Sequence, residues 1–291
     1  MRYISLASIA AAAVAFTFAI SLGGTRALAA PTLPDFAPIN FAPGAPIDNP
    51  YFPLVPGTRF RYAANVTDPE NGETVFEEDE DFVTTETRTI AGVQVRVVHA
   101  RSWEDGELAE DTLDYFAQDK SGNVWYLGED TKAFERDDEG NIISADTTGS
   151  WRAGVNDAKP GFVMPADTTI GFNYYQEFAP NDEALDQATI LSTSETVSTP
   201  AGDFSDVLKT REETEIEPDV LEFKYYAPGV GLVLVEENVD DAGVPQTRIP
   251  LISVANVGTA IPLPAAFGPG LAGLAFVLGA AMTPWRRHRA C

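Results

Sequence analysis

Histidine, the side chain that most often acts as a general base, is scarce in this sequence, with two among 291 residues. His288 lies in a basic C-terminal tail, so His99 is the histidine of the main part of the chain. It follows the alternating valines of residues 93–97 and shares their face with Arg101 and Trp103. We interpret His99 as a strand residue hydrogen-bonded to a neighbour, with a functional role at the mouth of a barrel as the alternative. No Gly-x-Ser-x-Gly motif occurs, so serine-hydrolase chemistry is not expected and no catalytic residue is assigned.

Metal chemistry is limited by the same scarcity, because Cys291 is the single cysteine. Zinc, copper and iron sites need clustered His and Cys, so none is expected. Calcium prefers carboxylates and carbonyls, which are abundant. One segment has the spacing of a calcium loop, although a β-hairpin turn explains the same residues. This weak calcium candidate consists of Glu135, Asp137, Glu139 and Asp146, with Gly140 between them.

Carboxylates and aromatic residues leave two functional classes open. Glycoside hydrolysis needs two carboxyl groups at a suitable distance, and among 44 Asp and Glu no pair stands out. Tyr174-Tyr175 and Tyr225-Tyr226 are adjacent pairs, so in a strand one member of each faces the core and the other faces the opposite side. That opposite side could bind sugars or line an apolar pocket, although packing explains these aromatics equally.

The charge distribution excludes several partners. The chain carries 44 acidic and 19 basic residues, a formal net charge of −25. All the acids and 14 of the basic residues lie between positions 31 and 259, which gives 14 − 44 = −30 for that stretch. Such a surface repels phosphate backbones and anionic lipids, so nucleic acid is excluded as a partner and membrane contact is expected only through an apolar C-terminal helix. Cations, neutral sugars, apolar ligands and proteins remain.

The elements that position these residues are predicted to be strands. Alternating apolar and polar residues with turn signals between them recur at residues 58–66, 74–90, 93–97, 108–118, 124–127, 132–136, 172–178, 188–197, 207–215, 221–226, 231–239 and 247–254. No comparable stretch has helical spacing. We therefore predict an all-β fold: a single large antiparallel meander of roughly ten to twelve strands that forms a curved sheet, a half-barrel or a barrel.

A run of five acids, residues 77–81, falls within one of these strands. A buried charge without a partner is costly, and this run would place acids on both faces of a strand. We therefore expect it on an exposed edge or in a loop, where charge prevents edge-to-edge aggregation.

The N-terminus is predicted to be a signal peptide, residues 1–30. Arg2 precedes an apolar stretch at residues 9–22, and Ala27, Ala29 and Ala30 provide small residues for cleavage. An uncleaved anchor is the alternative. Residues 31–56 hold eight prolines and are expected to form an extended lead-in. Residues 57–255 would then form the all-β extracellular domain.

The C-terminus, residues 256–291, has the layout of a sorting signal. The motif at residues 261–265 precedes an apolar segment at 266–284, long enough to cross a bilayer as a helix, and a basic tail at 285–291. The motif consists of Ile261, Pro262, Leu263, Pro264 and Ala265, and the tail carries Arg286, Arg287 and Arg289. These residues resemble the PEP-CTERM class of bacterial sorting signals, in its Val-Pro-Leu-Pro-Ala variant with Ile261 replacing the valine.

The resemblance implies a Gram-negative protein that is anchored in the membrane by this helix and then sorted to the cell surface or released. An exosortase-type enzyme would recognise and remove the tail, and export is often linked to extracellular polysaccharide. A plain transmembrane anchor is the alternative.

A second resemblance involves four phrases in the middle of the chain, at residues 48–58, 122–126, 200–204 and 225–233. They resemble a group of uncharacterised secreted or lipid-anchored bacterial β-proteins over residues 48–239, with the general look of half-barrel lipoprotein carriers. No activity comes with this resemblance. We therefore expect an exported protein with a non-catalytic binding or structural role, linked to polysaccharide or an apolar ligand. An extracellular carbohydrate-active hydrolase with a carboxylate pair is the alternative.

Overall fold

The computed structural model describes residues 30–67, 72–137, 139–218 and 220–258. Within them the chain forms strands and one short 3-10 helix, η1 (Pro38–Asn40). The strands are β1 (Asp48–Asn49), β2 (Phe52–Pro53), β3 (Thr58–Thr67), β4 (Thr74–Ile90), β5 (Val93–Glu104), β6 (Glu107–Gln118), β7 (Val124–Asp130), β8 (Ala133–Arg136), β9 (Ile142–Asp146), β10 (Trp151–Arg152), β11 (Lys159–Met164), β12 (Asn173–Tyr175), β13 (Glu177–Phe178), β14 (Asp186–Thr199), β15 (Gly202–Thr214), β16 (Leu221–Ala227), β17 (Gly231–Glu237) and β18 (Thr247–Asn256).

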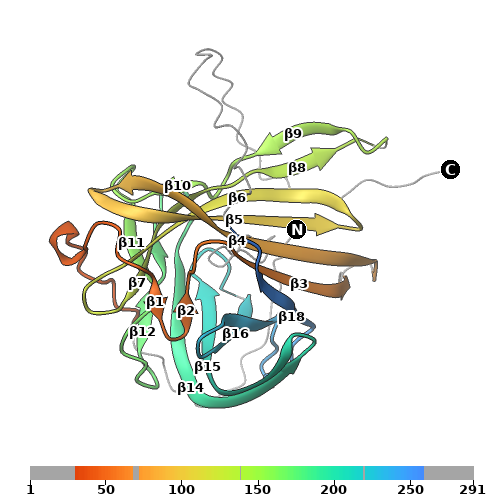
Figure 1. The fold of residues 1–291 in the computed structure, drawn as a ribbon. Coiled ribbons are helices and arrows are strands. Elements are labelled where there is room, and N and C mark those ends of the chain that lie inside the picture. The colour runs from red at the N-terminus through yellow and green to blue at the C-terminus, as the bar shows by residue number, and fades with distance from the viewer. Residues whose placement is uncertain (1–29, 68–71, 138, 219, 259–291) are drawn as a thin grey trace, which may run out of the picture.

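The main sheet is a nearly closed antiparallel barrel. Its strand order is β12-β14-β15-β16-β17-β18-β3-β4-β5-β6-β7-β11-β13, so most neighbours in the sheet are also neighbours in sequence (Figure 1). Pairing of β18 with β3 joins a C-terminal meander to an N-terminal one. The two ends of the order, β12 and β13, are consecutive in the chain, which brings the edges together.

Closure requires a glycine. A Cβ atom on Gly161 of β11 would collide with the carbonyl oxygens of Tyr175 and Gln176, which lie in β12 and directly after it. Only glycine permits this approach of backbones.

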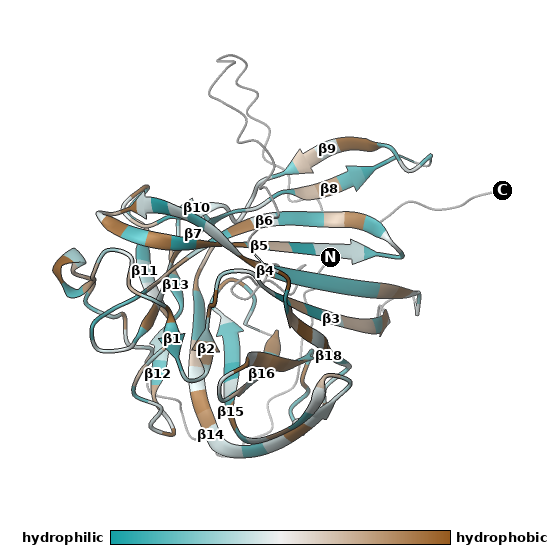
Figure 2. Cartoon of the chain, in the orientation of Figure 1, coloured by the Kyte–Doolittle hydropathy of each residue, from teal (hydrophilic) through white to brown (hydrophobic). Residues whose placement is uncertain are grey.

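The predicted all-β class and antiparallel meander are confirmed, with thirteen strands in the main path where ten to twelve were expected. Teal and brown segments alternate along the same ribbons, as expected for strands with two different faces (Figure 2). A hairpin of β8 and β9 projects from the barrel, and every residue of β9 is exposed (Figure 1).

One end of the barrel is filled with the protein's own side chains, and we call it the closed end. Phe52, from the lead-in, is 1% exposed and its ring lies 5.4 Å from that of Phe116 on β6 and 6.3 Å from that of Tyr226 on β16. Outside the sheet, Phe36 and Phe41 contact Trp125 edge-on. Residues of the lead-in therefore both fill this end and cover part of the outer face.

The expectation for the run at residues 77–81 is wrong. The run lies in β4, which is paired on both sides, with β3 and with β5. Glu77, Asp79, Glu80 and Asp81 are buried, and Asp81 is 0% exposed. Acids therefore lie inside this protein as well as on its surface.

No helix in the described ranges is long and apolar enough to span a membrane. The predicted signal peptide up to residue 29, the motif at residues 261–265, the segment at 266–284 and the tail at 285–291 lie outside the described residues.

Candidate functional site

A layer of carboxylic acids lines the inside of the barrel, and we call it the inner acid layer. Each of its members is at most 7% exposed. The members are Glu77, Asp79 and Asp81 of β4, Glu110 and Asp114 of β6, Glu129 of β7, Glu177 of β13, Asp186 of β14, Glu212 of β15, Glu222 of β16 and Glu237 of β17. Among the described residues, Lys224 is the one buried lysine or arginine.

The strand register places these acids on one face. Tyr62, Asp79, Ser102 and Glu110 lie opposite one another across β3, β4, β5 and β6. Residues that are directly opposite in an antiparallel pair point to the same side of the sheet. On the other wall, Glu212 lies opposite Glu222.

The contacts of Phe52 identify the face that carries these acids as the inside of the barrel. Phe52 contacts Phe116 and Tyr226, which lie on facing walls of the barrel. The hydroxyl of Tyr226 donates to Glu212, and that of Tyr126, which stacks on Phe116, donates to Asp114. The acids therefore lie inside, above the apolar floor at the closed end.

The layer lies toward the end of the barrel opposite the closed end, which we call the acidic end. The connections β3–β4, β5–β6, β15–β16 and β17–β18 are at this end, because strands of a meander alternate in direction. Glu77, Glu110, Glu212, Glu222 and Glu237 all lie within four residues of one of these connections.

Lys224 forms ion pairs with two acids of the layer, on the wall made by β15 and β16. Its Nζ lies 2.9 Å from Glu212 Oε2 and 3.8 Å from Glu222 Oε2. Glu212 Oε1 also accepts hydrogen bonds from the hydroxyls of Thr210 at 2.8 Å and Tyr226 at 3.1 Å. The two glutamates raise the pKa of Lys224 against the opposing effect of burial, so its ammonium stays charged.

The facing wall has acids without such a cation. Neither carboxylate oxygen of Asp79 nor of Asp81 has a hydrogen-bond partner among the described residues. The hydroxyl of Ser102, opposite Asp79 and 4% exposed, is also unpartnered within that part of the chain. Buried polar groups are nearly always hydrogen-bonded, so this group of unpaired ones is a candidate binding site.

Burial changes the protonation of this layer. Loss of solvation raises the pKa of Glu77 to about 9 and that of Glu222 to about 8. It raises the pKa of Glu110 and of Asp186 to about 7, and the pKa of Asp81 well above its usual range. The ligand-free layer therefore holds several neutral carboxyl groups at neutral pH, and a cation would favour their charged form.

Acids on the outer face are paired differently. Glu80 lies between Asp79 and Asp81 in sequence but points outward, where it forms ion pairs with Arg59 and Arg101. The inward neighbours of Glu80 in sequence, Asp79 and Asp81, have no hydrogen-bond partner among the described residues.

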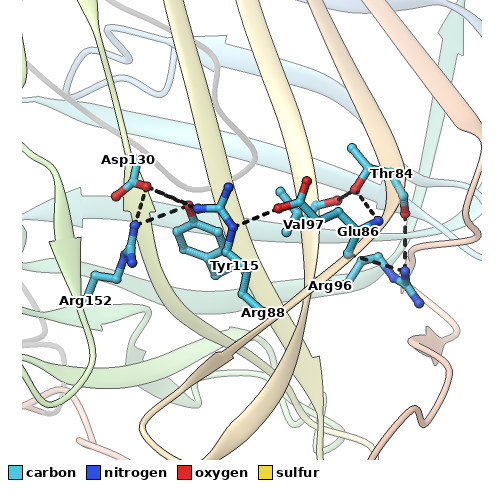
Figure 3. Close-up of polar contacts among 8 residues, drawn as sticks. All are labelled: Thr84, Glu86, Arg88, Arg96, Val97, Tyr115, Asp130 and Arg152. Carbon is cyan, nitrogen blue, oxygen red and sulfur yellow. Dashed lines mark hydrogen bonds and ion pairs between the residues drawn. The ribbon is translucent and has the colours of Figure 1, made fainter. Parts of the chain in front are cut away.

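A second polar cluster lies on the outer face, around Tyr115 (Figure 3). The guanidinium groups of Arg88 and Arg152 lie 5.2 Å and 4.9 Å from the centre of its ring. Asp130 accepts hydrogen bonds from the Tyr115 hydroxyl, at 2.8 Å, and from both arginines (Figure 3). Asp130 and Glu86 together balance the charge of these two arginines, so we interpret the cluster as a structural network across strands.

The residues predicted from the sequence are placed as follows. His99 is buried and its Nε2 lies 3.0 Å from Asp111 Oδ1, which confirms the hydrogen-bonded interpretation. Tyr174 and Tyr226 point into the core, as the alternation requires, but Tyr225 is also buried, with its hydroxyl on Glu236.

The weak calcium candidate is spread along the β8–β9 hairpin. Asp137 accepts hydrogen bonds from the turn that includes Asn141, Glu135 accepts one from Ser144, and Asp146 accepts from Thr148. Glu139 contributes a backbone N–H to the same turn. No group of three or more His, Cys, Asp or Glu side chains suited to a metal ion occurs within the described residues.

The inner acid layer was not recognised from the sequence, although a signal for it exists. Glu77, Asp79 and Asp81 are spaced at i, i+2 and i+4, as are Glu110, Thr112 and Asp114, and Glu222, Lys224 and Tyr226. This period places each set on one face of a strand.

No family model matches this chain, and no curated protein sequence matches it. Among solved structures, a candidate lipoprotein from Parabacteroides distasonis is similar over 70% of this chain and 98% of its own, with 16% identity and a TM-score of 0.35. At that score the two chains need not share a fold, and the comparison assigns no function.

Proposed function

We propose that this chain is an exported, non-catalytic binding protein whose ligand site is the inner acid layer of the barrel. The observation that carries the proposal is the pair of buried, unpartnered carboxylates of Asp79 and Asp81. Burying unpaired carboxyl groups destabilises a fold, and such a cost is typical of a site shaped for a ligand.

The position of the layer favours a polar ligand over an apolar one. Apolar space at the closed end is filled by Phe52, Phe116 and Tyr226, whose rings are in contact. Nearer the acidic end, inward side chains include the carboxyl groups of the inner acid layer, the Lys224 ammonium and the Ser102 hydroxyl, which bind through charge and hydrogen bonds.

The second candidate function is glycoside hydrolysis, and one observation favours it. Glu212 is ion-paired with Lys224, whereas the nearby Glu222 has a pKa raised to about 8. One charged and one neutral carboxyl group are the pair that glycosidases use as nucleophile and acid. Glycan turnover that is lost in Glu222→Gln would support this candidate and contradict the non-catalytic proposal.

The binding proposal predicts that the protein retains a small molecule during gentle purification. Native mass spectrometry of the full chain, expressed with its own termini and purified from the envelope fraction, is expected to show a mass excess that disappears on denaturation. The double substitution Asp79→Asn and Asp81→Asn should abolish the excess, whereas Glu80→Gln, on the opposite face of β4, should keep it. An excess that survives the double substitution, or no excess for any variant together with no binding in titrations, would sink the proposal.

Export and surface sorting are supported by the sequence of the two termini. The mature protein is expected to begin near Pro31 and to end near Pro264, after removal by the signal peptidase and an exosortase-type enzyme. Intact-mass measurement of material released from the cell surface tests this. A mass that still includes Arg286 to Cys291 would leave a plain membrane anchor.

A further inference from the structure

We propose that the ligand of the inner acid layer is a linear aliphatic polyamine, with at least two ammonium groups held along β4. This inference rests on the proposed function and specifies its ligand. The unpaired acids that would hold it are Asp79 and Asp81, with Glu77 next along the same face.

The spacing of these acids matches such a molecule. Glu77, Asp79 and Asp81 form a ladder of acids on one face of β4, because the residues between them point outward. Successive members of this ladder are about 6 to 7 Å apart along the strand. Two amines separated by a chain of three or four carbons span a comparable distance. A linear polyamine can therefore place one ammonium group at each step, whereas a compact cation can neutralise one step only.

Lys224 shows how this interior accommodates an ammonium group. On the wall formed by β15 and β16, its Nζ contacts Glu212 and Glu222. Asp81 is close enough to Lys224 for that charge to act on it, so the ladder faces this ion pair across the barrel. The wall that carries the ladder has the same acids without a cation, and an amine from outside would supply the missing partner.

The neutral groups beside the ladder provide independent support. The Ser102 hydroxyl lies opposite Asp79, is 4% exposed and has no partner among the described residues. An ammonium group has three N–H donors, so one held at Asp79 can also donate to this hydroxyl. The ring of Tyr62, opposite Asp79 on the other side, offers an aromatic neighbour for a cation.

Other ligand classes fit the ladder less well. A bare divalent cation is compact, so it would contact only one step of the ladder. A neutral sugar would hydrogen-bond to these carboxyl groups, but it carries no charge that would favour their ionised form. A polyamine satisfies both the charge and the spacing.

Isothermal titration calorimetry of the full chain in a non-ionic detergent tests the inference, with spermidine, butylamine, calcium chloride and magnesium chloride as probes at matched ionic strength. Spermidine is expected to bind at least about tenfold more tightly than butylamine, because only spermidine reaches two acids at once. Calcium and magnesium should bind more weakly than spermidine. This comparison uses the unmodified protein and so does not depend on the folding of a variant.

Variants identify the place of binding. Asp79→Asn with Asp81→Asn should weaken spermidine at least about tenfold, because two charge-assisted contacts are lost. Glu80→Gln removes the same kind of charge from the outer face and should change the affinity less than about twofold. Thermal melts of each variant report on folding, and the Asn variants should melt close to the parent, because burial already favours the neutral form of Asp79 and Asp81 and an amide of the same shape replaces it.

The outcomes separate this inference from the proposed function. The polyamine inference would be overturned if spermidine and butylamine bind with equal affinity, or if the affinity for spermidine is unchanged in the double variant. If calcium or another co-purified molecule binds instead and is lost in the double variant, the inner acid layer remains a binding site and only the polyamine is wrong. If no probe binds and nothing co-purifies, both proposals fail.

Discussion

Raising the pH from 5.5 to 8.5 is expected to lower the melting temperature of the ligand-free protein by at least about 5 °C. The cause is the inner acid layer, where burial raises the pKa of Glu110 and Asp186 to about 7, of Glu222 to about 8 and of Glu77 to about 9. In the unfolded chain these groups ionise near pH 4 to 4.5.

The sign follows from proton counting. Between the unfolded and folded pKa values the native state binds more protons than the unfolded state, so the free energy of unfolding falls as pH rises. The stabilising contribution is complete below about pH 4 and is lost as pH rises through 7 to 9. Like charges strengthen the effect, since Glu77 faces Glu237 and Glu104, and Glu222 faces Glu237 and Glu212. Lys224 opposes it at Glu222.

Differential scanning calorimetry across this pH range is the measurement. Glu77→Gln should flatten the pH dependence, because the amide cannot ionise. Glu78→Gln provides the matched control, since Glu78 lies next in sequence, points outward and pairs with the exposed Arg61. A melting temperature that rises from pH 5.5 to 8.5, or equal slopes for the two variants, would show that the inner acids are solvated and ionised in the native state.

Replacing Lys224 by methionine is expected to destabilise the protein by about 3 to 5 kcal/mol. The substitution keeps most of the apolar length of the side chain but removes the ammonium group from Glu212 and Glu222. Both carboxyl groups are buried, so removal of their cation leaves charge without compensation. At this chain length the loss corresponds to a fall in melting temperature of roughly 10 °C.

Urea unfolding of Lys224→Met, Glu212→Gln and the double variant measures the contribution of the pair. The double variant should be more stable than Lys224→Met alone, because the glutamine still accepts hydrogen bonds from Thr210 and Tyr226 without carrying a charge. Lys209→Met is the control on the adjacent strand. Its Nζ lies 3.8 Å from the ring centre of Phe223, and its loss should cost less than about 1 kcal/mol. A loss of similar size for both lysine variants would contradict the role given to Lys224.

Much of the fold was predictable from local pattern. The alternation at residues 93–97 and the turn residues at 119–123 specify strands and reversals through backbone geometry, and both are present in the structure. A hydrogen bond from His99 to a neighbouring residue was also predictable, because a histidine in a strand has cross-strand neighbours. The structure identifies that neighbour as Asp111 on β6.

The inner acid layer shows where local pattern is insufficient. The i, i+2 spacing of Glu77, Asp79 and Asp81 determines that they share a face, but the same spacing is typical of a solvated strand face. Local reasoning assigned them to the surface because an isolated buried acid is costly. Long-range pairing reversed that assignment by enclosing their face.

The sequence by itself determined the element type, the approximate strand positions and which side chains share a face, because these depend on a period of two along one strand. Only the tertiary structure decided which face is the inside, since that depends on pairing of β18 with β3 and on the approach of β11 to Tyr175 past Gly161. Closure of the sheet brings Asp81 of one wall near Lys224 of the other, although the two residues are 143 positions apart in the sequence. The sequence pattern of either strand cannot predict that Asp81 and Lys224 are close, because their separation is set by the circumference of the closed sheet.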